Sequence, residues 1–248
     1  MDPTTTTDRD LVVELRDVNR HYQMGETVVR ALDSVTFQIE RGTYWAIMGP
    51  SGSGKSTLLN VLGCLDRPSS GQYLLGGEDV SRFSDDKLSE VRGERLGFVF
   101  QSFQLIQQLS ILENVEVPLF YQGVSPRESR ARAQESLEKV GLGDRMHHRP
   151  NELSGGQQQR AAVARALVNQ PLVLLADEPT GNLDSKTAKE MLDLFDELHA
   201  QGRSILLVTH DPEVASRAEW VLRLLDGRVH RVERSGRRAA AAPGGAGA

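Results

Sequence analysis

Three nearly continuous apolar stretches predict strands buried on both faces. They cover residues 44–49, 172–177 and 204–210, with the sequences "YWAIMG", "LVLLAD" and "SILLVTH". Parallel strands that helices cover on both sides have this pattern, and each stretch lies near a segment with helical periodicity. We therefore predict an α/β core built on a parallel sheet.

The segment before this core has a strand pattern of another kind. In "SVTFQIERG" the apolar residues Val35, Phe37 and Ile39 alternate with polar ones, as in a strand with one face in water. We expect an antiparallel β subdomain here. Near the other end, Asp226 and Gly227 lie between two alternating stretches in "VLRLLDGRVHRVE", which predicts a closing hairpin with a two-residue turn.

A helical insertion is expected within the core, over about residues 102–168. Its clearest segment is "SPRESRARAQESLEKVG", with Ser125 as N-cap, Pro126 at the first helical position and Glu128 three residues after the cap. Gly141 is a natural C-terminal stop, so we predict a helix from about 126 to 140. One domain over residues 11–234 then contains this helical subdomain.

The two ends of the chain are poor material for a core. Residues 1–10 are polar, and residues 235–248 ("SGRRAAAAPGGAGA") have low complexity, so we expect disorder in both. No apolar run approaches the roughly 18 to 20 residues that cross a bilayer, and the N-terminus lacks the features of a signal peptide. We expect a cytoplasmic protein that a partner can hold at a membrane.

Charge and cysteine content narrow the function further. The net charge of −5 is spread out, with no basic stripe, which disfavours nucleic acid as a partner. The single cysteine, Cys64, excludes an intramolecular disulfide. It lies in the apolar run "LLNVLGCL", where we favour core packing over redox chemistry.

The stretch "GPSGSGKST", residues 49–57, matches the phosphate-loop pattern G-x-x-x-x-G-K-[ST]. It follows a predicted buried strand and precedes an apolar helical segment, which is the context the motif requires. Its backbone N–H groups and the helix N-terminus suit phosphate, Lys55 reaches the β and γ phosphates, and Ser56 is placed to bind Mg²⁺. The alternative is a plain glycine-rich turn. The predicted nucleotide-contacting residues are Gly49, Ser51, Gly52, Ser53, Gly54, Lys55, Ser56 and Thr57.

Four more candidates follow predicted strands of the core. Asp177 and Glu178 come at the end of "LLADE", and we assign Asp177 to Mg²⁺ and Glu178 to the water that attacks the γ phosphate. His210 ends the third apolar stretch and is a candidate γ-phosphate contact. Gln101 ends "GFVFQ" and is a candidate sensor of Mg²⁺ or water. Without the phosphate loop, each would be an ordinary residue at a strand end.

A second glycine-bearing helix start occurs in "LSGGQQQR". Ser154 and Gln157 have the spacing of a capping box, but Gly155 and Gly156 each cost about 1 kcal/mol relative to alanine in a helix. We infer that something approaches this backbone closely, and a phosphate fits. The chain has one set of Mg²⁺ and hydrolytic residues, so one nucleotide is expected to meet both helix starts. If the insertion holds Ser154 away from Lys55, the two share ATP only across two chains.

Taken in order, "GPSGSGKST", Gln101, "LSGGQQQR", "LLADEP", "NLD" and His210 resemble the nucleotide-binding subunit of ABC transporters, over residues 11 to about 232. The resemblance implies a P-loop NTPase fold with a RecA-like core. It implies a head-to-tail homodimer in which ATP lies between the phosphate loop of one subunit and the other subunit's helix start. It further implies Mg²⁺ ligation by Ser56, Gln101 and Asp177, with Asp184 at the dimer seam. It also implies Tyr22 stacked on adenine, for which packing in the core or at an edge is the alternative. The partner's contacts to ATP are then Ser154, Gly155, Gly156 and Gln157.

Three further stretches, "LGCLDRPSSG", "LSILENVEVPL" and "DEPTGNLDSKT", resemble the branch with macrolide exporters and lipoprotein-releasing ATPases. This resemblance implies an ATPase, peripheral on the inner face of the cell membrane, that powers export or extraction by a separate integral-membrane permease. The stretch "FQLIQQLSILENVEVPLF" in the insertion is a candidate contact with that permease, and burial of most of its apolar residues within the subdomain is the alternative.

Two alternatives remain at this point. One is a soluble ABC-type ATPase that acts on nucleic acid or ribosomes, which the absence of long coiled coils, zinc modules and a second cassette disfavours. The other is regulatory nucleotide binding without turnover. The presence of both Glu178 and His210 argues against it.

Overall fold

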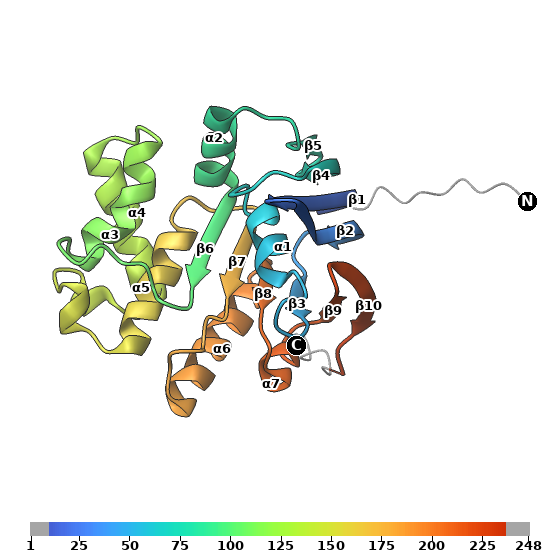
Figure 1. Ribbon diagram of the computed structural model, residues 1–248. Coiled ribbons are helices and arrows are strands. Elements are labelled where there is room, and N and C mark those ends of the chain that lie inside the picture. Colours follow the sequence, from blue (N-terminus) through green and yellow to red (C-terminus); the bar gives the residue numbers. More distant parts are fainter. Residues whose placement is uncertain (1–9, 237–248) are drawn as a thin grey trace, which may run out of the picture.

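The computed structural model describes residues 10–236 (Figure 1). The two ends for which we expected disorder lie almost wholly outside this range. At its limits, the backbone N–H of Arg41 donates to the carbonyl of Asp10 at 2.8 Å. The N–H of Ser235 donates to the carbonyl of Glu219 at 2.8 Å. Asp10 and Ser235, which the sequence placed in the two ends, are thus hydrogen-bonded to the folded part.

A six-stranded sheet forms the centre of the molecule, in the order β10-β9-β3-β8-β7-β6. Five strands run parallel and β10 pairs antiparallel at one edge. The three apolar stretches form β3, β7 and β8, so the predicted α/β core is confirmed. The strands are β3 (Tyr44–Met48), β6 (Leu96–Phe100), β7 (Val173–Asp177), β8 (Ser204–Val208), β9 (Trp220–Leu225) and β10 (Arg228–Arg234).

An antiparallel sheet of four strands lies beside it, in the order β2-β1-β4-β5. Val35, Phe37 and Ile39 are buried on one face of β2, as their alternation predicts. They share a hydrophobic cluster with α1 and with residues of the central sheet, so this core joins the two sheets. The elements are β1 (Leu11–Met24), β2 (Thr27–Glu40), β4 (Ser70–Leu75), β5 (Glu78–Asp79) and α1 (Lys55–Leu62).

Cys64 belongs to the same cluster. Its side chain is buried, and this burial raises the pKa of the thiol to about 11. The thiolate is the reactive form, so Cys64 is an inert packing residue at neutral pH. The prediction of core packing is confirmed.

Helices form a second hydrophobic cluster with the central sheet. Helices α3, α4 and α5 pack against one another, and α5 also packs on β6 (Figure 1). Ser125 caps α4 by accepting from the N–H of Glu128, and Gly141 has a positive φ after the helix, as predicted. The helices are α2 (Asp85–Arg95), α3 (Ile111–Tyr121), α4 (Pro126–Lys139), α5 (Gly155–Leu167), α6 (Ser185–Ala200) and α7 (Pro212–Ala215), with short 3₁₀ turns at Gly143–Arg145 and Pro150–Glu152.

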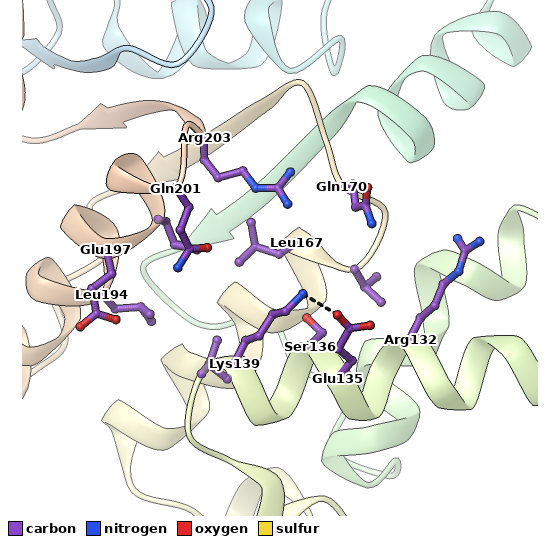
Figure 2. Close-up of a pocket in the computed structure, with 13 residues that line it drawn as sticks. Arg132, Glu135, Ser136, Lys139, Leu167, Gln170, Leu194, Glu197, Gln201 and Arg203 are labelled. Atoms are coloured by element: carbon purple, nitrogen blue, oxygen red, sulfur yellow. Dashed lines mark hydrogen bonds and ion pairs between the residues drawn. The ribbon is translucent and has the colours of Figure 1, made fainter. Parts of the chain in front are cut away.

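Two smaller features complete the fold. Asp226 and Gly227 both have positive φ, 48° and 74°, so they form the tight turn of the predicted β9–β10 hairpin. A polar cavity of about 90 Å³ lies between α4 and the C-terminal ends of α5 and α6, where Lys139 pairs with Glu135 (Figure 2). Within residues 10–236, no helix is long and apolar enough to cross a membrane.

Candidate active site

The candidate residues meet at the carboxyl ends of four parallel strands. Gly49 follows β3, Gln101 follows β6, Asp177 ends β7 and His210 lies two residues after β8. Asp177 pairs in register with Phe100 on one side and Val208 on the other, so these segments end at the same level. Open α/β sheets bind their ligands at this edge.

Close packing explains the glycines of the phosphate loop. A Cβ on Gly49 would lie 2.3 Å from the carbonyl oxygen of Leu224 in β9. Gly54 is the N-cap of α1 with φ 99°, and a Cβ there would lie 2.4 Å from the carbonyl oxygen of Ala31. No other residue fits these two positions without a shift of the backbone. The loop is therefore held tightly between β9 and β2.

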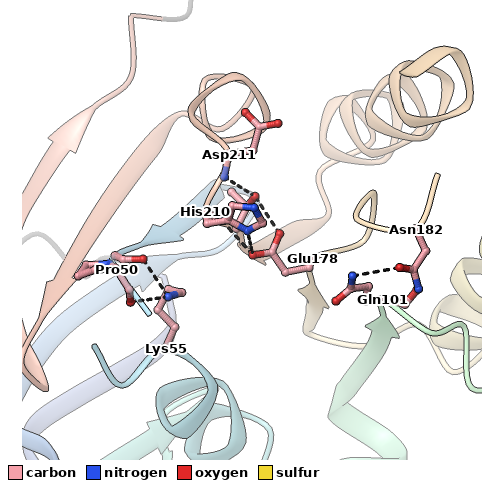
Figure 3. A network of polar contacts seen from close by, with 9 residues as sticks. Pro50, Lys55, Gln101, Glu178, Asn182, His210 and Asp211 are labelled. Atoms are coloured by element: carbon pink, nitrogen blue, oxygen red, sulfur yellow. Dashed lines mark hydrogen bonds and ion pairs between the residues drawn. The ribbon is translucent and has the colours of Figure 1, made fainter. Parts of the chain in front are cut away.

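Lys55 and Ser53 are fixed by this loop. The Lys55 ammonium group donates to the carbonyl oxygens of Gly49 and Pro50, each at 2.8 Å, so the loop closes around it (Figure 3). Ser53 is 2% exposed, and its Oγ has no hydrogen-bond partner in the described part of the chain. This burial leaves only the backbone of Ser53 for the predicted contact with a nucleotide.

Glu178 is held by the end of β8. Its backbone is left-handed, with φ 44°, and its N–H donates to the carbonyl of Val208 at 2.9 Å. The carboxylate accepts from the His210 N–H at 3.0 Å and from Thr209 Oγ1 at 3.2 Å, and its Oε1 lies 2.6 Å from His210 Nδ1 (Figure 3). A left-handed non-glycine residue is strained by about 1–3 kcal/mol, and such strain concentrates at functional sites.

The electrostatics of this edge favour a cation. Burial, and then the charge of Glu178, raise the pKa of Asp177, while Lys55 lowers it. The hydrogen bond to Glu178 raises the pKa of His210. Residues 10–236 contain no cluster of three His, Cys, Asp or Glu that would hold a metal alone. The donors Ser56, Gln101 and Asp177 offer oxygens, which fit Mg²⁺ when phosphates supply the other ligands.

Gln101 lies with Asn182 in this structure. The Gln101 amide donates to Asn182 Oδ1 at 3.1 Å, and the Asn182 amide donates to the Gln101 carbonyl at 3.0 Å (Figure 3). The amide nitrogen of Gln101 is therefore engaged by Asn182 in this structure. Sequence reasoning did not predict Asn182 or Thr209 as partners. An asparagine beside a glycine has the pattern of an ordinary turn residue.

Ser154 and Gln157 form the expected capping box. Ser154 Oγ accepts from the Gln157 N–H at 3.3 Å, and Gln157 Oε1 accepts from the Ser154 N–H at 3.0 Å. A Cβ on Gly156 would lie 2.2 Å from Thr187 Cγ2 of α6, whereas one on Gly155 would have 3.6 Å to its nearest neighbours. Packing against Thr187 is thus a reason within the chain for glycine at position 156, and the contact of Gly156 with a partner's nucleotide stays a prediction. Only Gly155 lacks such a reason.

The two glycine-bearing helix starts lie on separate elements. Helix α5 packs on β6, and β6 is three positions from β3 in the sheet. Three strand spacings amount to about 14 Å. Lys55, directly after the loop that follows β3, and Ser154, at the start of α5, are therefore not neighbours within one chain.

Asp184 and Tyr22 have partners within the chain. Asp184 caps α6, where its carboxylate accepts from the N–H groups of Lys186 and Thr187 at 3.1 Å. The Tyr22 hydroxyl donates to Asp66 at 2.6 Å, and the Arg20 guanidinium lies 4.5 Å from the centre of its ring. Tyr22 thus contacts Asp66 and Arg20 within the chain, and adenine stacking stays a prediction.

Comparison with known proteins decides the family. The family model described as "ABC transporter" matches residues 32–181. The chain belongs to this family. An uncharacterized ABC transporter ATP-binding protein of Thermotoga maritima is 55% identical, over 91% of this chain and 96% of its own length. The macrolide export ATP-binding/permease protein MacB of Hyphomonas neptunium is 53% identical over 93% of this chain, which spans 36% of that protein.

Solved structures of ABC proteins share the fold. The ATP-binding cassette MJ0796, in a dimeric post-hydrolysis state with ADP and Pi, has a TM-score of 0.81 and 45% identity, covering 90% of this chain and 98% of its own. The cbiO1 protein of Clostridium perfringens, part of the transporter complex cbiONQ, has a TM-score of 0.82 and 29% identity, covering 91% and 89%. The chain is thus an ABC transporter nucleotide-binding subunit with the P-loop NTPase fold and ATPase activity. These comparisons do not support the nucleic-acid alternative.

Proposed function

We propose that two copies of this ABC ATPase form a head-to-tail dimer that binds two Mg²⁺–ATP between its subunits. ATP binding and hydrolysis by this dimer then power a separate integral-membrane permease. The observation that carries the proposal is the separation of Lys55 from the Ser154 helix start. Both are built for phosphate, and two strands of the central sheet lie between β3 and β6. Gly155, the glycine with room for a side chain, then lies where the partner's triphosphate arrives.

Within each site, the residues of one chain have distinct tasks. Lys55 and the loop N–H groups bind the β and γ phosphates, and Ser56, Asp177 and Gln101 hold Mg²⁺. When bound, Mg²⁺ neutralises charge on the phosphates. Glu178 orients and deprotonates the attacking water.

The contact between Glu178 and His210 suggests how the catalytic carboxylate stays inactive until ATP binds. At 2.6 Å from Nδ1, the carboxylate of Glu178 is engaged by the His210 ring. A γ phosphate competes for that ring, because it offers a stronger negative charge. Release of His210 then frees the carboxylate of Glu178 for the water.

A permease contact is proposed at the end of α3. Several apolar residues of the stretch 103–120 are buried, including Leu112, Val115 and Leu119. Phe120 and Tyr121 are 76% and 82% exposed, and their rings meet edge to face at 5.6 Å. Exposed aromatic pairs are enriched in protein interfaces. Because MacB relatives are named as ATP-binding/permease proteins, we propose a permease partner on the inner face of the membrane, and export or extraction as the work done.

Mixing two defective chains tests the sandwich. Lys55→Ala removes the charged contact to phosphate and keeps the Ser154 helix start. Gly155→Asp keeps the loop and places a negative charge where the partner's phosphate docks, at a position with room for it. Each variant alone should be inactive, and the mixture should regain hydrolysis because one composite site is intact. A mixture as inactive as its parts would contradict the head-to-tail arrangement.

A further inference from the structure

Gln159 links the Ser154 helix to both catalytic segments. It lies in α5, five residues after Ser154, and its side chain is 0% exposed. Its Nε2 donates to the carbonyl of Pro179 at 2.7 Å and to the carbonyl of Phe100 at 3.3 Å. Pro179 directly follows Glu178, and Phe100 directly precedes Gln101. One amide group therefore touches the backbone beside the catalytic carboxylate and beside the Mg²⁺ sensor.

Burial of this amide has a cost that packing alone does not explain. Gln159 Oε1 is buried and has no hydrogen-bond partner among residues 10–236. An apolar side chain of similar volume would fill the same space without an unpaired oxygen. Its neighbours on the helix, Ala161 to Ala164, are indeed all apolar and buried. The hydrogen bonds that Nε2 donates are therefore what favours glutamine over an apolar residue at position 159.

The other polar contacts of α5 do not make this double link. Gln158 donates to the carbonyl of Leu153, within its own segment, at 3.1 Å. Arg165 donates to the carbonyls of Phe103 and Gln104, which come after Gln101. Gln159 differs because its amide reaches β6 and the loop after β7 together. Hydrogen bonds are directional, so they fix the position of α5 more closely than aliphatic packing does.

We propose that Gln159 is a positioning residue that couples the Ser154 helix start to Glu178 and Gln101 of the same chain. When the partner's ATP docks on Ser154 and Gly155, the shift of α5 reaches the backbone at Pro179 and Phe100 through this amide. Each chain then completes its own catalytic geometry only when it also holds its partner's nucleotide. This inference rests on the proposed head-to-tail sandwich.

Substitution of neighbouring glutamines tests the coupling. Gln159→Met keeps the length of the side chain and removes both donors, and Gln158→Met is the matched control on the same helix. We expect Gln159→Met to bind a fluorescent ATP analogue as the parent does and to keep KM for ATP within about threefold. Its kcat should fall at least about tenfold, and its Hill coefficient for ATP should approach one, because small misplacements of catalytic groups cost one to two orders of magnitude. Gln158→Met should retain the parent's kcat and Hill coefficient.

Thermal unfolding and a double-mutant cycle separate positioning from a structural role. Each variant is assayed well below its own Tm, and Gln159→Met is combined with Gln101→Ala. Sub-additive losses in kcat support the coupling, and fully additive losses overturn it. An unchanged kcat in Gln159→Met, or equal losses of kcat and nucleotide affinity, also overturns it. Mixing the Lys55→Ala and Gly155→Asp chains tests the head-to-tail dimer independently of Gln159. Failure of the proposed dimer can therefore be distinguished from failure of the proposed coupling.

Discussion

Glu178 shows how the chemistry of the site depends on single residues. Its left-handed backbone directs the carboxylate to the end of β8, where Thr209 and His210 surround it. Asp177, one residue earlier, stays half-buried near Lys55. Two adjacent carboxylates thus have different surroundings, which suits one for Mg²⁺ and the other for water.

Glu178→Gln should retain ATP binding and abolish hydrolysis. The amide cannot take a proton from water, and removal of a negative charge beside the γ phosphate stabilises the closed state. Phosphate release should fall at least about a hundredfold. In Mg²⁺–ATP, light scattering after size-exclusion chromatography should show a dimer. A monomer under these conditions would contradict the sandwich.

The titration of His210 should depend on Glu178. The hydrogen bond to Glu178 raises the pKa of His210 above its ordinary value near 6.5. The stabilisation from this pair is fully present below the ordinary pKa and is lost as pH rises through the raised one. In nucleotide-free protein, Glu178→Gln should return the pKa to the ordinary range, measured by NMR titration of the His210 ring. An unchanged titration would show that the pair does not form in solution.

At the scale of elements, the contact between α5 and α6 explains one of the two adjacent glycines, Gly156. Gly156 allows Thr187 of α6 to approach the first turn of α5. Thr187 is held by Asp184, the N-cap of α6, through its Oγ1 at 2.6 Å. The starts of both helices are therefore fixed relative to each other by two caps and one glycine.

Gly156→Ala should destabilise the fold, unlike Gly155→Ala. The new Cβ would meet Thr187 Cγ2 at 2.2 Å, and overpacking of this kind costs about 1–3 kcal/mol in the free energy of unfolding. Adding Thr187→Ala should recover most of that loss, because the next contact is 3.6 Å. Urea unfolding measures all three variants. Equal stability of the two single alanine variants would refute this explanation.

At the scale of the whole molecule, two hydrophobic clusters stabilise the fold, and one exposed aromatic pair belongs to neither of them. One cluster joins the two sheets through α1, and the other joins the central sheet to α3, α4, α5 and α6. Phe120 and Tyr121 belong to neither, at the far end of α3 from its cap Ser110. Their side chains can therefore contact a partner without disturbing the buried core residues.

Phe120→Ser with Tyr121→Ser should separate assembly from catalysis. Because both side chains are exposed, Tm and basal ATP hydrolysis should match the parent. Copurification with a membrane subunit in detergent should be lost. Leu65→Ser, at another exposed apolar side chain, is the control and should leave copurification intact. Retention of the membrane subunit by the double variant would place the docking surface elsewhere.

Local sequence patterns were sufficient to predict much of the fold and of the candidate site. The phosphate loop, the strands and the caps of α4 and α5 could be predicted because glycine spacing, apolar periodicity and cap residues act over a few positions of the chain. Positions at the ends of predicted strands indicated Glu178, His210 and Gln101, and the family resemblance added Tyr22 and Asp184. The two ends for which we expected disorder lie, apart from Asp10, Ser235 and Gly236, outside the described residues. The roles of Tyr22 and Asp184 toward a nucleotide or a second chain stay predictions.

Contacts between distant segments were decided only by the tertiary structure. Gln101 and Asn182 are 81 residues apart, and Gln159 and Phe100 are 59 apart. Thr187 accounts for Gly156 because α6 packs against the start of α5. No local pattern encodes these pairs, since each depends on where the packed sheet places elements that the chain itself keeps far apart. The sequence by itself determined which groups carry the chemistry, and the fold determined which of them touch.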